Sequence, residues 1–298
     1  MNLFTVLSFG LLLMCLSSLD DAVAANDVEL GNVSTETFPL SRQASGISFS
    51  TVPSTDSAIS TTVAPLLQNG DLVDKKYFPT VFRTFSADTL CTAVLVGEAA
   101  ILTAAHCITD ETYVDFGFES KTVTGFCERA PKYNAISNKS EDWSLCLLQF
   151  PVLNMRYERV STQIPKPGLS ITLMGYGCTK PGSLPDFKLR IGLSNTVSAD
   201  STYLPYSENL IYSYSNLKYD KNAVLCIGDS GGPMFYIVGN TYTSAREILG
   251  INSGTTGYQG YSIFAATGSA SAQKFFIEWT GRHRQKICGI NESNTRCM

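Results

Sequence analysis

The feature that most constrains the fold of this chain is a long series of short apolar runs separated by turn-forming residues. From about residue 67 to about residue 265, mostly apolar runs alternate with Gly, Pro, Asn and Ser. Representative runs are residues 80–85 (TVFRTF), 93–96 (AVLV), 100–103 (AILT), 145–148 (LCLL) and 170–174 (SITLM). Runs of this length suit β-strands, and their frequent recurrence predicts an all-β sandwich or barrel.

One stretch near the C-terminus has helical periodicity instead. Between residues 270 and 284, the apolar residues Ala272, Phe275, Phe276 and Trp279 recur three and four residues apart. Side chains with that spacing lie on one face of an α-helix. We therefore predict a C-terminal helix at 270–284 whose apolar face packs against the rest of the domain.

The N-terminus has the pattern of a secretory signal. Residues 3–17 (LFTVLSFGLLLMCLS) form an apolar run that is too short to span a bilayer, and residues 22–24 (AVA) follow as an A-x-A cleavage site. We interpret residues 1–24 as a signal peptide and the protein as secreted. Attachment of a lipid to Cys15 is the alternative, which the bulky residues 12–14 disfavour.

The composition changes before the strand-like region begins. Residues 43–65 contain ten Ser or Thr and hold too little large apolar surface to fold alone. We interpret residues 25–66 as a pro-segment or linker, and residues 67–298 as the folded domain.

The cysteine count indicates disulfides. Nine cysteines become eight when Cys15 leaves with the signal peptide, and an even number in a secreted chain predicts four disulfides. Zinc is the alternative use of cysteine, but no two cysteines have C-x-x-C spacing and the chain has only two histidines. We expect no metal. Because eight cysteines can pair in many ways, the count alone leaves the connectivity open.

The stretch at residues 226–233 (CIGDSGGP) places Ser230 between glycines, which formally fits the G-x-S-x-G nucleophile elbow of α/β-hydrolases. In that fold the catalytic histidine follows the serine, and His283 is the one histidine after Ser230. His283 lies in a basic stretch (GRHRQK), where a solvated side chain at a helix end is the simpler interpretation. The alternating β and α segments of that fold are also absent, so we reject this interpretation.

The other histidine precedes the serine. His106 lies in residues 102–107 (LTAAHC), and Asp142 follows in residues 141–145 (EDWSL). The order His106, Asp142, Ser230 is that of the chymotrypsin-like serine proteases.

On these three motifs the chain resembles the trypsin/chymotrypsin family, from about Leu67 to the C-terminal helix. The resemblance implies two antiparallel six-stranded β-barrels, at roughly residues 67–160 and 161–269, with the active site between them. The predicted C-terminal helix would follow the second barrel.

The resemblance assigns a catalytic role to each of the three residues. A serine hydroxyl is a poor nucleophile at neutral pH, so His106 is expected to take the proton of Ser230 and later return it to the leaving amine. Asp142, with Ser253 behind it, would hold the imidazole in the required tautomer. The backbone N–H groups of Gly228 and Ser230 are expected to bind the oxyanion, and no cofactor is needed.

The resemblance also implies activation by proteolysis. In the family, an aspartate beside the nucleophile pairs with a newly released α-amino group, which here would join Asp229 to Leu67 after cleavage between Leu66 and Leu67. Leu67 stands where the family usually has Ile or Val, and Leu66 where it usually has Lys or Arg, so we do not expect trypsin as the activator. The alternative is that Asp229 is a local cap.

The family pattern also suggests how the cysteines pair. The bridge that steadies the catalytic histidine corresponds to Cys91–Cys107, and closing a loop of that length contributes about 3 kcal/mol in the chain-entropy model. For the other cysteines we propose Cys127–Cys146, which would join neighbouring strands beside Asp142, and Cys178–Cys226. The pair Cys178–Cys226 would replace the family's usual partner for Cys226, because no cysteine lies between Cys226 and Cys288. Cys288–Cys297 would then hold the C-terminal tail.

The specificity pocket of the family corresponds to Val224, Leu225, Ser253 and Gly260. Trypsin-like members carry an aspartate where this chain has Val224, and no acidic residue occurs between Glu247 and Glu278. A substrate Arg would be buried there without a partner, which costs about 3 to 5 kcal/mol. We expect an apolar residue before the scissile bond, with Leu225 making the pocket shallow.

Together these features predict a secreted serine endopeptidase that hydrolyses peptide bonds in proteins and peptides through an acyl-enzyme. We expect a monomer made as a zymogen, with an activating protease and a protein inhibitor as further partners. The formal net charge of −4 gives no basic surface for a nucleic acid or an anionic membrane, so neither is expected as a partner. The alternative is a catalytically silent protease homologue that acts as a binding protein.

Overall fold

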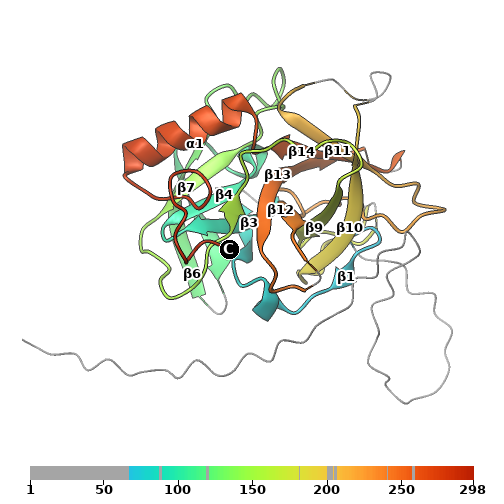
Figure 1. Cartoon of the computed structure of the whole chain (residues 1–298), viewed down its shortest axis with the longest axis horizontal. Helices are drawn as coiled ribbons and strands as arrows, with labels where there is room; N and C mark the ends of the chain where they lie inside the picture. Colours follow the sequence, from blue (N-terminus) through green and yellow to red (C-terminus); the bar gives the residue numbers. More distant parts are fainter. Residues whose placement is uncertain are drawn as a thin grey trace, which may run out of the picture. The chain divides into compact units, whose positions relative to one another are not determined.

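The computed structural model describes residues 67–298 except 87–88, 119–120, 181, 200–203, 205–206, 240 and 257–258. These residues form two β-barrels and a C-terminal helix (Figure 1), which confirms the predicted fold. The signal peptide expected at residues 1–24 and the pro-segment at 25–66 lie outside the described residues. In the part of the chain that the structure describes, no helix has the length and apolar character needed to cross a membrane.

The first barrel closes through antiparallel strands in the order β2-β3-β4-β7-β6-β5, with β5 pairing back to β2. Its strands are β2 (Val81–Ser86), β3 (Thr89–Gly97), β4 (Ala100–Thr103), β5 (Thr112–Phe118), β6 (Lys121–Arg129) and β7 (Ser144–Leu148). Every residue of β4 is buried, as expected for a strand whose sequence is continuously apolar and which is covered on both faces.

The second barrel closes in the order β10-β11-β14-β13-β12-β9, with β9 pairing back to β10. Its strands are β9 (Ser170–Gly175), β10 (Arg190–Val197), β11 (Leu210–Tyr214), β12 (Pro233–Ile237), β13 (Arg246–Thr255) and β14 (Tyr261–Ala266). Apolar side chains that include Leu173, Leu249 and Phe264 fill its interior.

Two short strands, β1 (Asp71–Leu72) and β8 (Arg159–Val160), join the second sheet although both lie in the range 67–160 expected for the first barrel. β1 pairs with β10, and β8 pairs in parallel with β13. β1 precedes the strands of the first barrel and β8 follows them, and both run alongside the second barrel. Pairing with its strands gives hydrogen-bond partners to backbone groups that would otherwise have none.

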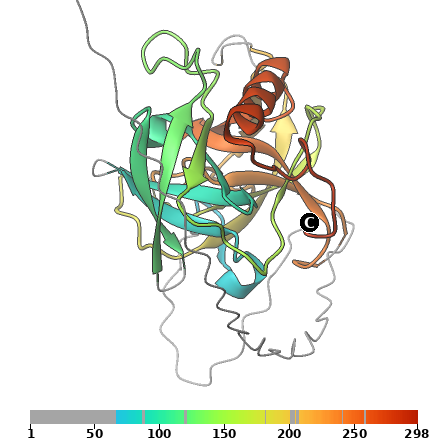
Figure 2. The same cartoon turned by 90° about the vertical axis from the view of Figure 1, so that its left-hand side faces the viewer.

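The helix α1 (Ala270–His283) occupies the predicted stretch and packs its apolar face against the first barrel. The hydroxyl of Ser269 caps its start by accepting the backbone N–H of Ala272. Phe276 and Trp279 are buried in one apolar cluster with residues of the first barrel, and α1 contacts β7 (Figure 2). The chain therefore returns from the second barrel to cover the first.

His283 has a different environment from the solvated one expected. Its Nε2 lies 2.5 Å from Oε1 of Glu128 on β6, and its side chain is 19% exposed. The pairing arises because α1 packs on the first barrel, which brings the helix end to β6.

A buried ion pair connects the two barrels. Two guanidinium nitrogens of Arg246, on β13, donate to the carboxylate of Glu158 at 2.6 and 2.8 Å. The hydroxyl of Thr80, just before β2, also donates to this carboxylate, and the guanidinium lies over the ring of Phe78 at 4.4 Å from the centroid. Both charged side chains are fully or almost fully buried, so each depends on the other for neutralisation.

Four disulfides join Cys91 to Cys107, Cys127 to Cys146, Cys178 to Cys226 and Cys288 to Cys297. These are the four pairs proposed from the sequence, including Cys178–Cys226, where the expected pairing departs from the usual one of the family. The first bridge links β3 to the 3₁₀ helix η2 (Ala105–Cys107), which contains His106. It therefore anchors the segment that carries the candidate base.

Candidate active site

Strand pairing in the first barrel brings His106 and Asp142 together. β4 pairs with β7 so that Thr103 lies opposite Ser144, which sets the residues after Thr103 beside those before Ser144. Nδ1 of His106 lies 2.7 Å from Oδ2 of Asp142, and the backbone N–H of His106 donates to Oδ1 at 2.9 Å. The carboxylate therefore fixes both the ring and the backbone of His106.

Asp142 is held in turn from the second barrel. The hydroxyl of Ser253, on β13, donates to Oδ2 of Asp142 at 2.6 Å. The side chain of Asp142 is 3% exposed, whereas that of His106 is 30% exposed. A shielded carboxylate of this kind can orient an imidazole and stabilise its cationic form, while the imidazole stays within reach of a substrate.

Ser230 lies on a tight turn that packs against the end of β4. Gly231 has a φ of 79°, and a Cβ at this position would lie 2.1 Å from Oγ1 of Thr103 and 2.3 Å from the carbonyl oxygen of Thr92. The turn therefore approaches the segment that leads from Thr103 into His106. Within the described residues, no hydrogen bond joins the Ser230 hydroxyl to the His106 ring; such contacts are often long before substrate binds.

Thr92, on β3, ties down the loop before Ser230. Its backbone N–H donates to the carbonyl of Ser230 at 2.7 Å, and its hydroxyl donates to the carbonyl of Gly228 at 2.9 Å. The same hydroxyl accepts the backbone N–H of Tyr176 at 3.1 Å. A strand of the first barrel thus sets the conformation of a loop in the second.

The loop keeps two backbone donors available. In the described part of the chain, the N–H groups of Gly228 and Ser230 donate to no protein acceptor. Gly228 has a φ of 99°, a conformation that favours glycine. Buried backbone N–H groups are normally paired, so two donors left open on one loop are suited to bind a developing negative charge.

Asn252 supports the same turn from β13. Its Nδ2 donates to the carbonyls of Asp229 and Met174, each at 2.9 Å. Its backbone exchanges hydrogen bonds with the turn, accepting from Gly231 and donating to Gly232, each at 2.8 Å. Neither Asn252 nor Thr92 was singled out from the sequence. The sequence signal that could have identified them is that each is a polar residue within an apolar run typical of a strand.

Asp229 is fully buried beside Ser230. Its carboxylate accepts the backbone N–H groups of Gly177 and Cys226, each at 2.8 Å. Burial raises the pKa of Asp229 to about 7, although these two hydrogen bonds and the charge of Arg190 oppose the rise. A carboxylate in this position would gain from a further positive charge.

Leu67 lies beside the segment that leads into the turn of Ser230. Its side chain is buried in an apolar cluster with Ala223 and Leu225, and the carbonyl of Gln68 accepts the backbone N–H of Val224 at 2.8 Å. In the intact chain the nitrogen of Leu67 is a peptide nitrogen, and no described interaction joins it to a carboxylate.

The residues expected to form the specificity pocket lie on three segments. Val224 and Leu225 are buried, and the N–H of Leu225 donates to the hydroxyl of Ser262 on β14 at 3.0 Å. Ser253 contacts Asp142, as described above. Gly260 has a φ of 79° and packs against Ser215, whose carbonyl oxygen would lie 1.9 Å from a Cβ at this position.

One group of potential metal ligands occurs among the described residues. Donor atoms of Cys91, His106 and Cys107 lie within 4.8 Å of one another. The two cysteines are joined in a disulfide, whereas metal binding requires the thiolate. We therefore do not assign a metal site to these three residues.

A two-barrel fold in which a buried aspartate holds a partly exposed histidine, together with a serine on a glycine turn packed against the segment that leads to that histidine, defines the chymotrypsin-fold class of serine proteases. The chain belongs to the trypsin family, because residues 68–274, more than half of the chain, match the family described as Trypsin.

The individual relatives have low sequence identity to this chain. Trypsin theta of Drosophila melanogaster is 28% identical over 178 residues, which cover 53% of this chain and 66% of that protein, slightly less than two thirds of its length. Thrombin-like enzyme AhV_TL-I of Gloydius halys is 26% identical over 181 residues, which cover 54% of this chain and 75% of that protein.

A solved structure has the same fold. Neuropsin, described as a serine protease expressed in the limbic system of mouse brain, superposes with a TM-score of 0.57 at 20% identity. The superposition covers 72% of this chain and 98% of neuropsin. At this identity the likeness establishes the fold alone.

Proposed function

We propose that this protein is a secreted serine endopeptidase with His106, Asp142 and Ser230 as its catalytic triad. The observation that carries the proposal is the hydrogen-bonded series from Ser253 through Asp142 to His106. The turn of Ser230, packed against the segment that leads to His106, supports the same assignment.

In the proposed reaction, Oγ of Ser230 attacks the carbonyl carbon of the scissile peptide bond while Nε2 of His106 takes the hydroxyl proton. The carbonyl oxygen becomes an oxyanion that accepts hydrogen bonds from the backbone N–H groups of Gly228 and Ser230. Each of these hydrogen bonds stabilises the transition state by roughly 2.7 to 4 kcal/mol. The C–N bond then breaks, and the imidazolium gives its proton to the leaving amine. Water, deprotonated by His106, hydrolyses the acyl-enzyme and restores Ser230.

Activation would occur by cleavage between Leu66 and Leu67, with the new α-amino group of Leu67 pairing with Asp229. The raised pKa of the buried Asp229 supports this assignment, because a nearby cation would offset its desolvation. The alternative, that Asp229 is a local cap, is supported by its hydrogen bond from Cys226 three residues earlier. N-terminal sequencing of active protein that begins at a residue other than Leu67 would exclude the cleavage proposal.

The substrates would be proteins and peptides with an apolar residue before the scissile bond. Val224 stands where trypsin-like members carry an acid, and no Asp or Glu occurs from residue 248 to residue 277. A buried substrate Arg without a partner would be disfavoured by about 3 to 5 kcal/mol.

Secretion is supported by the four disulfides, which persist in oxidising compartments. Residues 1–24 would be the signal peptide, and the mature enzyme would be a monomer. An activating protease and a protein inhibitor would be its regulatory partners.

Fluorophosphonate labelling before and after cleavage at Leu67 tests the proposal, with Ser230→Ala as the control. We expect labelling to appear on cleavage, to be absent in the control, and to accompany turnover of peptides ending in Phe, Leu, Ala or Val rather than Arg. If folded protein with a free Leu67 amine stays unlabelled, the enzyme proposal is wrong and the protein is better described as a binding homologue.

A further inference from the structure

A disulfide joins residues 226–230, the proposed oxyanion loop, to a segment of the second barrel. Cys226, the first residue of the loop, bonds to Cys178 across 48 residues. Cys178 ends the sequence GYGC at residues 175–178, which begins at the last residue of β9. Both cysteines are buried. The bridge therefore holds the start of the oxyanion loop against the 175–178 segment.

Two hydrogen bonds lie beside the bridge. The backbone N–H of Cys178 donates to the carbonyl of Ile227 at 2.7 Å, and that of Gly177 donates to the carboxylate of Asp229 at 2.8 Å. The packing is close, because a Cβ at Gly177 would lie 2.6 Å from Oδ1 of Asp229. The segment thus contacts the oxyanion loop at three successive points.

The hydrogen bond to Ile227 sets the direction of a proposed oxyanion donor. The carbonyl of Ile227 and the N–H of Gly228 belong to one planar peptide unit, and in a trans peptide these two groups point in opposite directions. Because the carbonyl points toward Cys178, the N–H of Gly228 points away from the 175–178 segment. Within the described ranges of the chain, this N–H donates to no protein acceptor.

Side chains restrain this peptide unit little. That of Ile227 is 66% exposed, and Gly228 has a φ of 99°, in a region that glycine enters at no steric cost. Rotation of the peptide unit is therefore opposed mainly by backbone contacts. Cys178 holds the carbonyl before Gly228, and the hydroxyl of Thr92 holds the carbonyl of Gly228 itself at 2.9 Å.

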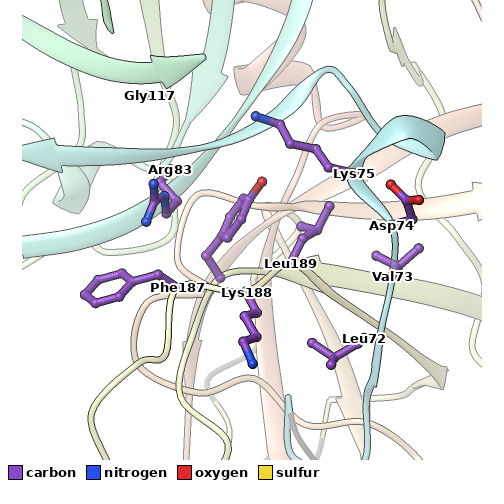
Figure 3. A pocket seen from close by; sticks show the side chains of 10 residues that line it. Leu72, Val73, Asp74, Lys75, Arg83, Gly117, Phe187, Lys188 and Leu189 are labelled. Carbon is purple, nitrogen blue, oxygen red and sulfur yellow. The ribbon is translucent and has the colours of Figure 1, made fainter. Parts of the chain in front are cut away.

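The 175–178 segment is itself anchored to the first barrel through Tyr176. The phenol of Tyr176 donates to the carbonyl of Val81, and its backbone N–H donates to the hydroxyl of Thr92, each at 3.1 Å. Tyr176 also lines a cleft of about 540 Å³ (Figure 3), together with residues 72–75, Arg83, Gly117 and residues 187–189. The bridge thus attaches the oxyanion loop to a segment whose position is already fixed.

We propose that the Cys178–Cys226 bridge positions the oxyanion donor of Gly228, which rests on the function proposed for this loop. The bridge keeps the N–H of Cys178 at the carbonyl of Ile227, so the N–H of Gly228 stays directed toward the scissile carbonyl. Without the bridge, the peptide unit between Ile227 and Gly228 rotates more freely and the donor is withdrawn for part of the time. Cys178 and Cys226 are positioning residues, because they act through Gly228.

Turnover of an apolar peptide by the protein cleaved at Leu67 tests the proposal. Cys178→Ala and Cys226→Ala are combined so that no unpaired thiol remains. We expect kcat to fall by about one to two decades, less than the roughly two to three decades lost when an oxyanion donor is removed outright. KM should change little, because the donor acts mainly on the transition state.

The Cys288–Cys297 bridge supplies the matched control. Its surroundings differ, since the N–H of Cys288 donates to the carbonyl of Val96 and Cys297 pairs with Tyr157. Replacing both of its cysteines with alanine also removes one disulfide, and should leave kcat unchanged. An equal fall of kcat in the two double variants would overturn the proposal.

Hydrogen exchange of both double variants gives a readout that does not depend on catalysis. Loss of the Cys178–Cys226 bridge should speed exchange severalfold at the N–H groups of residues 177, 178 and 229, which are bonded within this contact. The N–H groups of Gly231 and Asn252, which join the turn to β13, should keep their rates. Unchanged exchange at residues 177, 178 and 229 would also overturn the proposal.

The two readouts separate this proposal from the proposed function. If the cleaved parent turns over no peptide, the enzyme assignment is wrong, whereas faster exchange in the bridge variant alone still supports the positioning of the loop. If the bridge variant does not fold, graded reduction of the folded parent replaces it. Fluorophosphonate labelling should then fall in step with opening of Cys178–Cys226, mapped by mass spectrometry. A fall in step with opening of Cys288–Cys297 instead would contradict the proposal.

Discussion

The hydroxyl of Ser253 donates to Oδ2 of Asp142 at 2.6 Å, joining a strand of the second barrel to the buried carboxylate of the first. The same oxygen lies 2.7 Å from Nδ1 of His106. The orientation of the imidazole therefore depends on how the two barrels dock.

Changes at Asp142 and Ser253 should lower turnover to different extents. Asp142→Asn should reduce kcat by about 10⁴, because the amide favours the wrong imidazole tautomer. Ser253→Ala removes one hydrogen bond to a charged group, worth about 1.5 to 3 kcal/mol, and should reduce kcat by about one to two decades. Turnover of an apolar peptide substrate measures both. Equal losses in the two variants would contradict the supporting role assigned to Ser253.

Thr92 should act as a positioning residue for the oxyanion loop. Thr92→Val removes the hydroxyl that joins Gly228 to Tyr176, at a cost of about 1 to 3 kcal/mol for the buried groups left unpaired. We expect kcat to fall by about one to two decades with little change in KM, and Thr92→Ser to restore it. A loss of thermal stability with unchanged kcat would show that Thr92 has a structural role alone.

Gly231, next to the proposed nucleophile Ser230, and Gly254, on β13, should differ in their tolerance of a side chain. Gly231→Ala would bring a Cβ within 2.3 Å of two neighbouring oxygens at positive φ, so it should destabilise the fold by roughly 1 to 3 kcal/mol and abolish fluorophosphonate labelling. Gly254→Ala meets no atom within 4 Å and should stay within about 0.5 kcal/mol of the parent. Urea unfolding measures the difference, and similar stabilities for both variants would refute it.

The buried ion pair of Glu158 and Arg246 should contribute more to the free energy of unfolding than the neighbouring, more exposed pair of Arg159 and Glu247. Glu158→Gln leaves the charge of Arg246 without compensation and should lower the free energy of unfolding by about 3 to 5 kcal/mol. Glu247→Gln breaks the half-exposed contact with Arg159 and should cost less than about 1 kcal/mol. Chemical denaturation compares the two, and an equal effect would contradict this account.

Asp229 should make the uncleaved chain less stable as pH rises. Burial raises its pKa from 3.8 to about 7, so the folded state binds a proton more tightly than the unfolded state. The contribution of Asp229 to stability is then fully present below about pH 4 and is lost between about pH 4 and 7, by up to about 1.4 kcal/mol per pH unit. Asp229→Asn should remove this decline in unfolding experiments at a series of pH values. An unchanged slope in that variant would assign the effect to another group.

Local sequence patterns predicted both the type of an element and which of its residues are buried. The apolar run at residues 100–103 became the buried strand β4, and the spacing of Phe275, Phe276 and Trp279 became the buried face of α1. Such patterns work because the period of apolar residues follows from the geometry of one element. They could not show that β1 and β8 would join the second sheet, since that depends on which backbone groups meet in space.

The sequence by itself determined the types of elements, their order, and the order of His106, Asp142 and Ser230 along the chain. Only the tertiary structure decided which polar groups support them, because these contacts join distant parts of the chain. Thr92 bonds to Gly228 across 136 residues, and Glu158 bonds to Arg246 across 88. A buried polar side chain needs a hydrogen-bond partner. The barrel topology determines which residue that partner is, so the partner cannot be predicted from the local periodicity of the sequence.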